Sequence, residues 1–179
     1  FPTRRSSDLK QFSAITLDDG KILNSDESVS PGLVGSAVDY LSRLMNGAQP
    51  KEAFKISLNG AYLVGEFDKA TSLLDQIVGL DNQSIVAACI LVGYDVAFRA
   101  IPARFITVDA IHADEATIEN IRIMVQRSLH FLEIYGPITL DGFTFDSAYT
   151  DTITSGDGDY LTKDTLWDFK VIKSKPNKD

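Results

Sequence analysis

The pattern of hydrophobic and polar residues divides the chain into a helical part and a later part rich in strands. From residue 30 to about residue 135, apolar residues recur mostly at three- and four-residue spacing, which is typical of helices packed by one face. After Pro137, shorter runs of apolar, aromatic and threonine residues alternate with polar ones, as in strands. This order predicts the α+β class, with a helical N-terminal part and insertion followed by a three-stranded β-meander.

Two helices carry the clearest signals. Ser30-Pro31 predicts a helix start, because serine is a good N-cap and proline suits the first helical position, and Asn46-Gly47 predicts its end. Asp114 predicts the N-cap of a long helix that runs to Tyr135 and ends at Gly136-Pro137. The apolar faces are predicted to consist of Leu33, Val34, Ala37, Val38, Leu41 and Leu44 in the first helix, and Ile118, Ile121, Met124, Val125, Leu129 and Leu132 in the second.

The segments around these helices are predicted less directly. Residues 14–23 carry Asp18-Asp19-Gly20 between two apolar runs, which indicates a short hairpin. Between about residues 50 and 100 we expect a helical insertion of three helices, separated at 60–65 and 79–82. The third of them is apolar nearly all round and should be buried. Residues 105–108 could form a short strand or an extended link.

The three strands are predicted at 142–153, 157–161 and 165–172. In the last strand, alternation places Leu166, Asp168, Lys170 and Ile172 on one face, and Trp167, Phe169 and Val171 on the apolar face. A turn centred between residues 163 and 164 would set Tyr160 opposite Trp167, Asp159 opposite Asp168 and Asp157 opposite Lys170. Two facing aspartates repel each other unless a hard cation bridges them through oxygen ligands.

Other interpretations of this hairpin stay open from the residues alone. Its charged face could simply be solvated, with Asp157 and Gly158 forming a turn or bulge. A loop of odd length would move Asp159 to the opposite face, because side chains alternate along a strand.

Two motifs in this segment resemble the PD-(D/E)XK nuclease superfamily, in particular its RecB-like exonuclease branch, which includes CRISPR-associated exonucleases. They are Gly156-x-x-Asp159 and Trp167-Asp168-Phe169-Lys170. The resemblance implies that Asp159 and Asp168 bind Mg²⁺ or Mn²⁺, helped by the carbonyl of Phe169. It also implies that Lys170 positions the attacking water, so Asp159, Asp168 and Lys170 would be catalytic.

A weaker match lies upstream, in Gly35-x-x-x-Asp39, where this branch often has Gly-x-x-x-His with the histidine as a metal ligand. Aspartate is also a good oxygen ligand for magnesium, so the resemblance makes Asp39 a third candidate ligand. Alternatively, Asp39 is an exposed helix residue. The branch's Gln-x-x-x-Tyr motif is not found after Lys170, which stands nine residues before Asp179.

The ends of the sequence lead us to expect a fragment. Residues 1–9 look like the translation of a sequencing adapter, and residues 10–179 would form a single nuclease-like domain that lacks the last helix and strand of its core. A helical insertion would occupy about 50–100, between the first helix and the αβββ half of the core. Activity would then require the longer native protein.

Composition limits the setting. The chain has 179 residues, 44% of them hydrophobic, and no apolar run approaches the ~20 residues of a membrane span. The single cysteine, Cys89, lies in an apolar run and suits a reducing cytoplasm. A net charge of −8 argues against a protein that coats nucleic acid through bulk electrostatics, although a local metal site could still recruit phosphate.

Further polar residues are weaker candidates. Arg99 and Arg104 could face phosphate, although surface charge is the commoner role. His112 and His130 have no partner at zinc-ligand spacing, while Glu119 and Glu133 could reach a metal from a neighbouring helix.

The leading hypothesis is a metal-dependent nuclease that hydrolyses DNA. The exonuclease-like character rests on the resemblance alone. An alternative is a catalytically inactive nuclease-fold module that serves binding or assembly in a phage or mobile-element system. A third possibility is a small protein with no nucleic-acid role.

Overall fold

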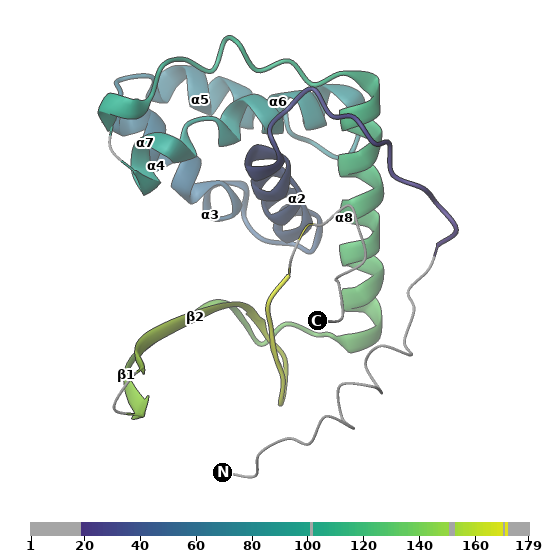
Figure 1. Ribbon diagram of the computed structural model, residues 1–179, viewed down its shortest axis with the longest axis vertical. Coiled ribbons are helices and arrows are strands. Elements are labelled where there is room, and N and C mark those ends of the chain that lie inside the picture. The colour runs from purple at the N-terminus through teal and green to yellow at the C-terminus, as the bar shows by residue number, and fades with distance from the viewer. Residues whose placement is uncertain (1–18, 101, 151–152, 170, 172–179) are drawn as a thin grey trace.

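The structure is a computed structural model that describes residues 19–100, 102–150, 153–169 and 171. Helices and a small antiparallel sheet make up the described chain, which confirms the α+β class. Shorter helices pack together beside the long helix α8 (Glu115–Tyr135), and the sheet lies at the end of α8 where that helix finishes (Figure 1). Within the described residues, no helix is long and apolar enough to cross a membrane.

The helical part begins with α2 (Pro31–Met45), which lies against α8 and α6. Ser30 is its N-cap residue and Asn46 its C-cap, and the Asp114 carboxylate caps α8 by accepting the amide N–H of Thr117. The apolar faces predicted for α2 and α8 form much of the core. Their fully or largely buried members are Val34, Ala37, Val38, Leu41, Ile118, Ile121, Met124, Val125 and Leu132.

The helical insertion contains more pieces than the three helices that the spacing predicts. They are α3 (Pro50–Ala53), α4 (Lys55–Leu63), α5 (Phe67–Leu74), α6 (Asn82–Val92) and α7 (Asp95–Arg99), followed by the 3₁₀ helix η1 (Pro102–Arg104). The predicted break at 60–65 is confirmed, because α4 ends at Leu63 and α5 begins at Phe67, although α4 continues through Gly60. A Cβ at Gly60 would collide with the backbone carbonyl of Tyr94, so this glycine lets the chain at the start of α7 approach α4 closely. The predicted break at 79–82 is confirmed.

Helix α6 is buried almost all round, as its composition predicts. Asp81 caps it by accepting the N–H of Ser84 at 3.0 Å. Cys89 is fully buried, and burial raises the pKa of its thiol to about 12. The cysteine is therefore a packing residue, since a thiol with so high a pKa is a poor nucleophile at neutral pH.

The described half of the predicted N-terminal hairpin, residues 19–23, is not a strand, and residues 14–18 lie outside the described residues. Arg127 of α8 holds this segment instead, through a 2.8 Å ion pair with Asp19 and a 2.7 Å hydrogen bond to the carbonyl of Lys21. Asn24 and Asn120 hydrogen-bond each other further along α8. Contacts between distant parts of the sequence thus override a local hairpin signal. Residues 105–107 are not in a strand.

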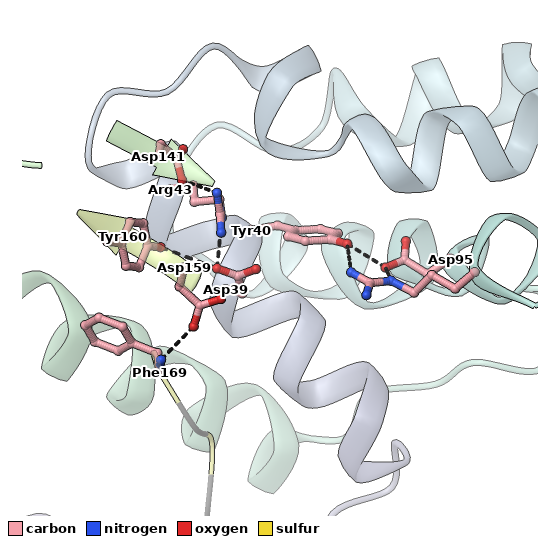
Figure 2. Close-up of polar contacts among 9 residues, drawn as sticks. Asp39, Tyr40, Arg43, Asp95, Asp141, Asp159, Tyr160 and Phe169 are labelled. Atoms are coloured by element: carbon pink, nitrogen blue, oxygen red, sulfur yellow. Dashed lines mark hydrogen bonds and ion pairs between the residues drawn. The ribbon is translucent and has the colours of Figure 1, made fainter. Parts of the chain in front are cut away.

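A buried polar cluster joins α2, α4 and α7. The Asp95 carboxylate, 4% exposed, accepts hydrogen bonds from the hydroxyls of Tyr40 at 2.7 Å and Ser57 at 2.6 Å. Arg99 donates to the Tyr40 hydroxyl at 3.0 Å, and Figure 2 shows Tyr40 and Asp95 pointing toward each other. Burial raises the pKa of Asp95, and these hydrogen bonds oppose the rise.

The sheet is a meander of β1 (Leu140–Thr150), β2 (Ile153–Leu161) and β3 (Leu166–Trp167), in the order β1-β2-β3. Tyr160 pairs with Trp167, which is the register predicted from the loop length. The prediction of a third strand through Phe169 is wrong, because β3 ends at Trp167. The Phe169 N–H is taken by the side chain of Asp159 and not by a backbone carbonyl, so the ladder does not continue. This short sheet supports the α+β class but not the nuclease core.

Candidate functional site

Aromatic rings attach the end of the meander to helix α8. The Phe131 ring lies 4.8 Å from the Trp167 ring and 5.1 Å from the Phe169 ring, centre to centre, both in edge-to-face geometry. Phe169 in turn meets the ring of Tyr160 at 5.2 Å. Trp167 and Phe169 are half-buried against α8, whereas Val171, the third residue of the predicted apolar face, is exposed, so that prediction is confirmed for two of its three residues. This packing fixes β2 and β3 beside α2 and α8. Gly158 aids the arrangement, since a Cβ there would collide with Leu166.

Arg43 connects the meander to helix α2. Its Nε donates to Oδ1 of Asp39 at 2.9 Å, one helical turn away, and its Nη1 forms an ion pair with Asp141 of β1. The guanidinium carbon lies 5.0 Å from the centre of the Tyr160 ring, within cation–π range. The Tyr160 hydroxyl donates to Asp39 Oδ1 at 3.3 Å. Asp39 is therefore held in one orientation by groups on two elements (Figure 2).

Asp159 lies near Asp39 but has different partners. Its Oδ2 accepts the backbone N–H of Phe169 at 2.6 Å, while the carboxylate is withdrawn from much of the solvent. This burial raises the pKa of Asp159, and the negative charges of Asp39 and Asp168 raise it further. The hydrogen bond from Phe169 and the charge of Arg43 act in the opposite direction. Asp159 thus sits beside two like charges that its partners only partly offset.

Asp39 and Asp159 both line a cavity of about 480 Å³ between α2, α8 and the end of the meander. Gly35, from the same motif as Asp39, and Phe169, from the motif that follows Asp159, also line it. The cavity therefore brings together motif residues from distant parts of the sequence, with Asp39 and Asp159 120 positions apart. The structure therefore places two of the four predicted site residues at one location.

The other two predicted site residues, Asp168 and Lys170, are not seen at this cavity. Asp168 is exposed and does not line the cavity, although its charge acts on Asp159. Lys170 lies outside the described residues, so its predicted pairing with Asp157 is not tested. Within the described part of the chain, no three His, Cys, Asp or Glu residues gather closely enough to hold a metal ion together.

Two carboxylates are nevertheless a reasonable donor set for magnesium. Mg²⁺ is usually held by one or two carboxylates, with waters and substrate phosphate oxygens completing six ligands. No hydrogen bond from a described residue reaches Oδ2 of Asp39 or Oδ1 of Asp159, which leaves one oxygen of each for a cation. A cation here would also offset the repulsion that raises the pKa of Asp159. The residues therefore fit a sparsely ligated, hydrated ion.

The weaker candidates from the sequence lie in structural contacts. Arg99 donates to Tyr40, Glu119 pairs with Arg122, and His130 lies 3.3 Å from Glu133. His112 and Arg104 are exposed and do not line the cavity that Asp39 and Asp159 share. None of these residues joins Asp39 and Asp159.

Sequence reasoning missed three residues of the site: Arg43, Tyr160 and Ser42. Arg43 could have been found from its position four residues after Asp39, since oppositely charged residues at that spacing face each other on a helix. Tyr160 was placed opposite Trp167, but nothing in the sequence indicates its contact with Asp39. Ser42, which lines the cavity, carries no signal in the sequence.

Comparisons with protein-family models, with curated proteins and with solved structures find no match to this chain.

Proposed function

We propose that the protein hydrolyses phosphodiester bonds of DNA with a Mg²⁺ or Mn²⁺ ion held by Asp39 and Asp159. One observation carries this proposal: Asp39 and Asp159, from motifs at opposite ends of the chain, line the same cavity. The resemblance of those motifs to the PD-(D/E)XK superfamily suggests the reaction, and the geometry supplies the two carboxylates that the reaction needs.

The ion would supply Lewis acidity, polarising a phosphate oxygen and lowering the pKa of water at the site. The chain's own residues provide the setting. Asp39 is held by Arg43 and Tyr160, and Asp159 by the Phe169 amide, so neither carboxylate has to reorganise when a cation binds. In this proposal Lys170, one residue beyond Phe169, orients the attacking water as the resemblance implies.

The raised pKa of Asp159 gives the proposal a pH dependence. A protonated carboxyl is a poor ligand, so acid should weaken the binding of the ion by neutralising Asp159 before an ordinary aspartate. A bound ion would favour the ionised form of Asp159, so binding of the ion would release that proton. Cleavage should therefore be lost at acidic pH earlier than the fold itself.

The test is cleavage of end-labelled single-stranded and duplex DNA by the full chain in Mn²⁺, with EDTA as the metal-free reference. We expect Mn²⁺-dependent product from the wild type and at least a hundredfold less from Asp159→Asn and Lys170→Ala. Asp39→Asn should lose less activity, because Asp159 can still hold the ion. The matched control is Asp75→Asn, at the exposed C-terminal end of α5 and outside this cavity.

Equal cleavage by the wild type and Asp159→Asn would contradict the proposal, because it would show that the reaction does not use this carboxylate. A wild type that binds Mn²⁺ but cuts neither substrate would favour the alternative function, a nuclease-like binding or assembly module. One observation favours that alternative: Arg43 already offsets much of the charge of Asp39, which weakens Asp39 as a ligand. DNA binding without cleavage would be its positive result.

A further inference from the structure

The cavity beside Asp39 and Asp159 also has a positively charged side. Arg127 lines it from α8, and among the described residues that line the cavity it is the one with a positive charge. A guanidinium binds phosphate with two parallel hydrogen bonds, in the same way as it binds a carboxylate. Arg127 therefore has the chemistry to bind an anion that enters beside the two aspartates, yet in this structure its guanidinium is engaged with a carboxylate of the chain itself.

That carboxylate is Asp19. Nη2 of Arg127 donates to Oδ1 of Asp19 at 2.8 Å and Nε donates to Oδ2 at 3.1 Å, which is the two-pronged arrangement. Nη2 also donates to the carbonyl of Lys21 at 2.7 Å. The hydrogen bonds from Arg127 and from the Lys21 amide lower the pKa of Asp19 to about 2, so this side chain is an anion at neutral pH. Asp19 thus presents to Arg127 the same pair of charged oxygens that a phosphate would.

Asp19 belongs to a strap, residues 19–29, that runs beside α8 before the chain enters α2 (Figure 1). The inner half of the strap, residues 24–29, is tied to fully buried side chains of that helix. The Asn24 amide donates to Asn120 at 2.7 Å, and the Ser28 amide donates to the Thr117 hydroxyl at 2.8 Å. Val29 ends this half inside the core. The inner half is therefore an integral part of the fold.

The outer half of the strap, residues 19–22, is held less firmly. Its ion pair with Arg127 joins two side chains that are about one-third exposed, and Lys21 meets Gln126 at the surface at 2.9 Å. Ile22 is 90% exposed. Contacts this open to solvent contribute little to stability, so the outer half should separate from α8 at low cost while the inner half stays in place. Leu23, which joins the two halves, lines the cavity.

We propose that Arg127 is a phosphate-binding residue of the cavity, and that the outer half of the strap is an autoinhibitory cover whose Asp19 occupies Arg127 until a phosphate displaces it. The inference rests on the proposed function, because the displacing phosphate would also contact the ion at Asp39 and Asp159. Its attachment to the chain gives Asp19 a high local concentration. Phosphate should therefore displace the strap efficiently only when the ion supplies a second contact.

A fluorophore on the strap reports its release. Ile22→Cys changes an exposed side chain, and Cys89 is fully buried, so a thiol-reactive dye should attach to the full chain at position 22. With Mg²⁺ present, inorganic phosphate should lower the fluorescence anisotropy of the dye saturably, because the released segment moves more freely. Sodium chloride at equal ionic strength controls for screening of the ion pair. Constant anisotropy over the concentrations at which phosphate binds would overturn the inference.

Variants of the two partners separate phosphate binding from simple tethering. Phosphate affinity, measured with Mg²⁺ present from the broadening of the ³¹P resonance, should rise about twofold to fivefold in Asp19→Asn, which removes an exposed competitor. It should fall about tenfold in Arg127→Gln, which removes a charged hydrogen-bond donor. A purely structural ion pair predicts that the two variants behave alike, because each breaks the same contact. Equal phosphate affinities in the two variants would therefore overturn the inference.

The controls make the same changes of charge outside the cavity. Asp26→Asn replaces an exposed aspartate in the inner half of the strap, and Lys55→Gln replaces an exposed lysine of α4. Both should keep the phosphate affinity of the wild type. A loss in Lys55→Gln equal to that in Arg127→Gln would show a response to total charge and would overturn the inference. If Arg127→Gln fails to fold, Asp19→Asn still decides, because its phosphate affinity must rise.

Mn²⁺ affinity, measured on the same proteins by electron paramagnetic resonance without phosphate, separates this inference from the proposed function. Mn²⁺ binding together with a phosphate affinity that neither variant changes would overturn the phosphate site and leave the metal site standing. Absence of both Mn²⁺ and phosphate binding in the wild type would overturn the two proposals together. Phosphate binding that follows Arg127 but is the same with and without Mg²⁺ would uphold the role of Arg127 and overturn its link to the ion.

Discussion

Asp95 and Asp159 are two aspartates withdrawn from water, and their surroundings differ in kind. Asp95 lies inside the helical part, where two hydroxyls donate to it and Arg99 lies nearby. Asp159 lies on the meander, where one amide donates to it and two other carboxylates raise its pKa. Burial raises the pKa of both side chains.

Under the proposed function, the difference separates a structural carboxylate, Asp95, from a proposed metal ligand, Asp159. The partners of Asp95 satisfy it within the fold, so it needs nothing from outside. The neighbours of Asp159 include Asp39, and both line an open cavity, so a cation would improve the electrostatics of this region. Mutations in the two regions should therefore separate stability from ligand binding.

The largest effect should come from Asp95→Ala. It leaves the buried hydroxyl of Ser57 without its acceptor and removes the acceptor of the Tyr40 proton, at ~1–3 kcal/mol for each unsatisfied group. We expect the free energy of unfolding in urea to fall by about 2–5 kcal/mol. Asp95→Asn, which keeps one acceptor oxygen, should lose less. A loss below 1 kcal/mol in Asp95→Ala would show that the cluster is not structural.

An intermediate effect is expected for Arg43→Gln, which removes the ion pairs between α2 and the meander. Because these groups are partly exposed, we expect a loss of about 1–2 kcal/mol in urea unfolding at low salt. Arg43→Lys keeps the charge without the planar guanidinium and should recover part of the loss. If both variants match the wild type in stability, Arg43 does not hold the meander in place.

The smallest effect should be the pH dependence of Asp159. Its pKa in the folded protein is above the ordinary value of 3.8, so the folded protein binds this proton more readily than the unfolded chain. The free energy of unfolding should therefore fall as pH rises from about 3.8 through the raised pKa, and stay level below that window.

The Asp159→Asn variant should lack this pH-dependent part of the free energy of unfolding. The measurement compares urea unfolding of the wild type and of the variant at a series of pH values. Mn²⁺ should also reduce this pH-dependent part in the wild type, because the cation favours the ionised carboxylate. The equivalent contribution of Asp95 should not respond to Mn²⁺. If Mn²⁺ changes the free energy of unfolding of Asp95→Asn and Asp159→Asn in the same way, the distinction between the two regions is removed.

The parts of the fold that the sequence predicts are those with local causes. Pro31 stands in the first turn of α2, Asp114 caps α8 by accepting the N–H of Thr117, and the pairing of Tyr160 with Trp167 follows from loop length. The failures have distant causes. Residues 19–23 are held by Arg127 from α8, and the glycine at position 60 makes room for the backbone of Tyr94 inside α4 and does not end the helix.

The candidate site also has parts that the sequence predicts and parts that depend on distant contacts. Spacing and resemblance singled out Asp39 and Asp159, and the structure places both at one cavity. The exposed position of Asp168 agrees with the alternative of a solvated charged face, whereas nothing in the sequence indicates that the side chain of Asp159 takes the Phe169 amide beyond the end of β3. The open oxygen atoms and the role of Arg43 depend on packing among three elements, which no single stretch of sequence records.

The most direct test of the metal site is calorimetric titration of Mn²⁺ into the full chain at neutral pH, compared with Asp159→Asn and the remote control Asp75→Asn. The site at Asp39 and Asp159 predicts one ion bound by the wild type and by Asp75→Asn, with affinity at least tenfold weaker in Asp159→Asn. Equal affinity in all three proteins, or no binding by the wild type, would contradict it.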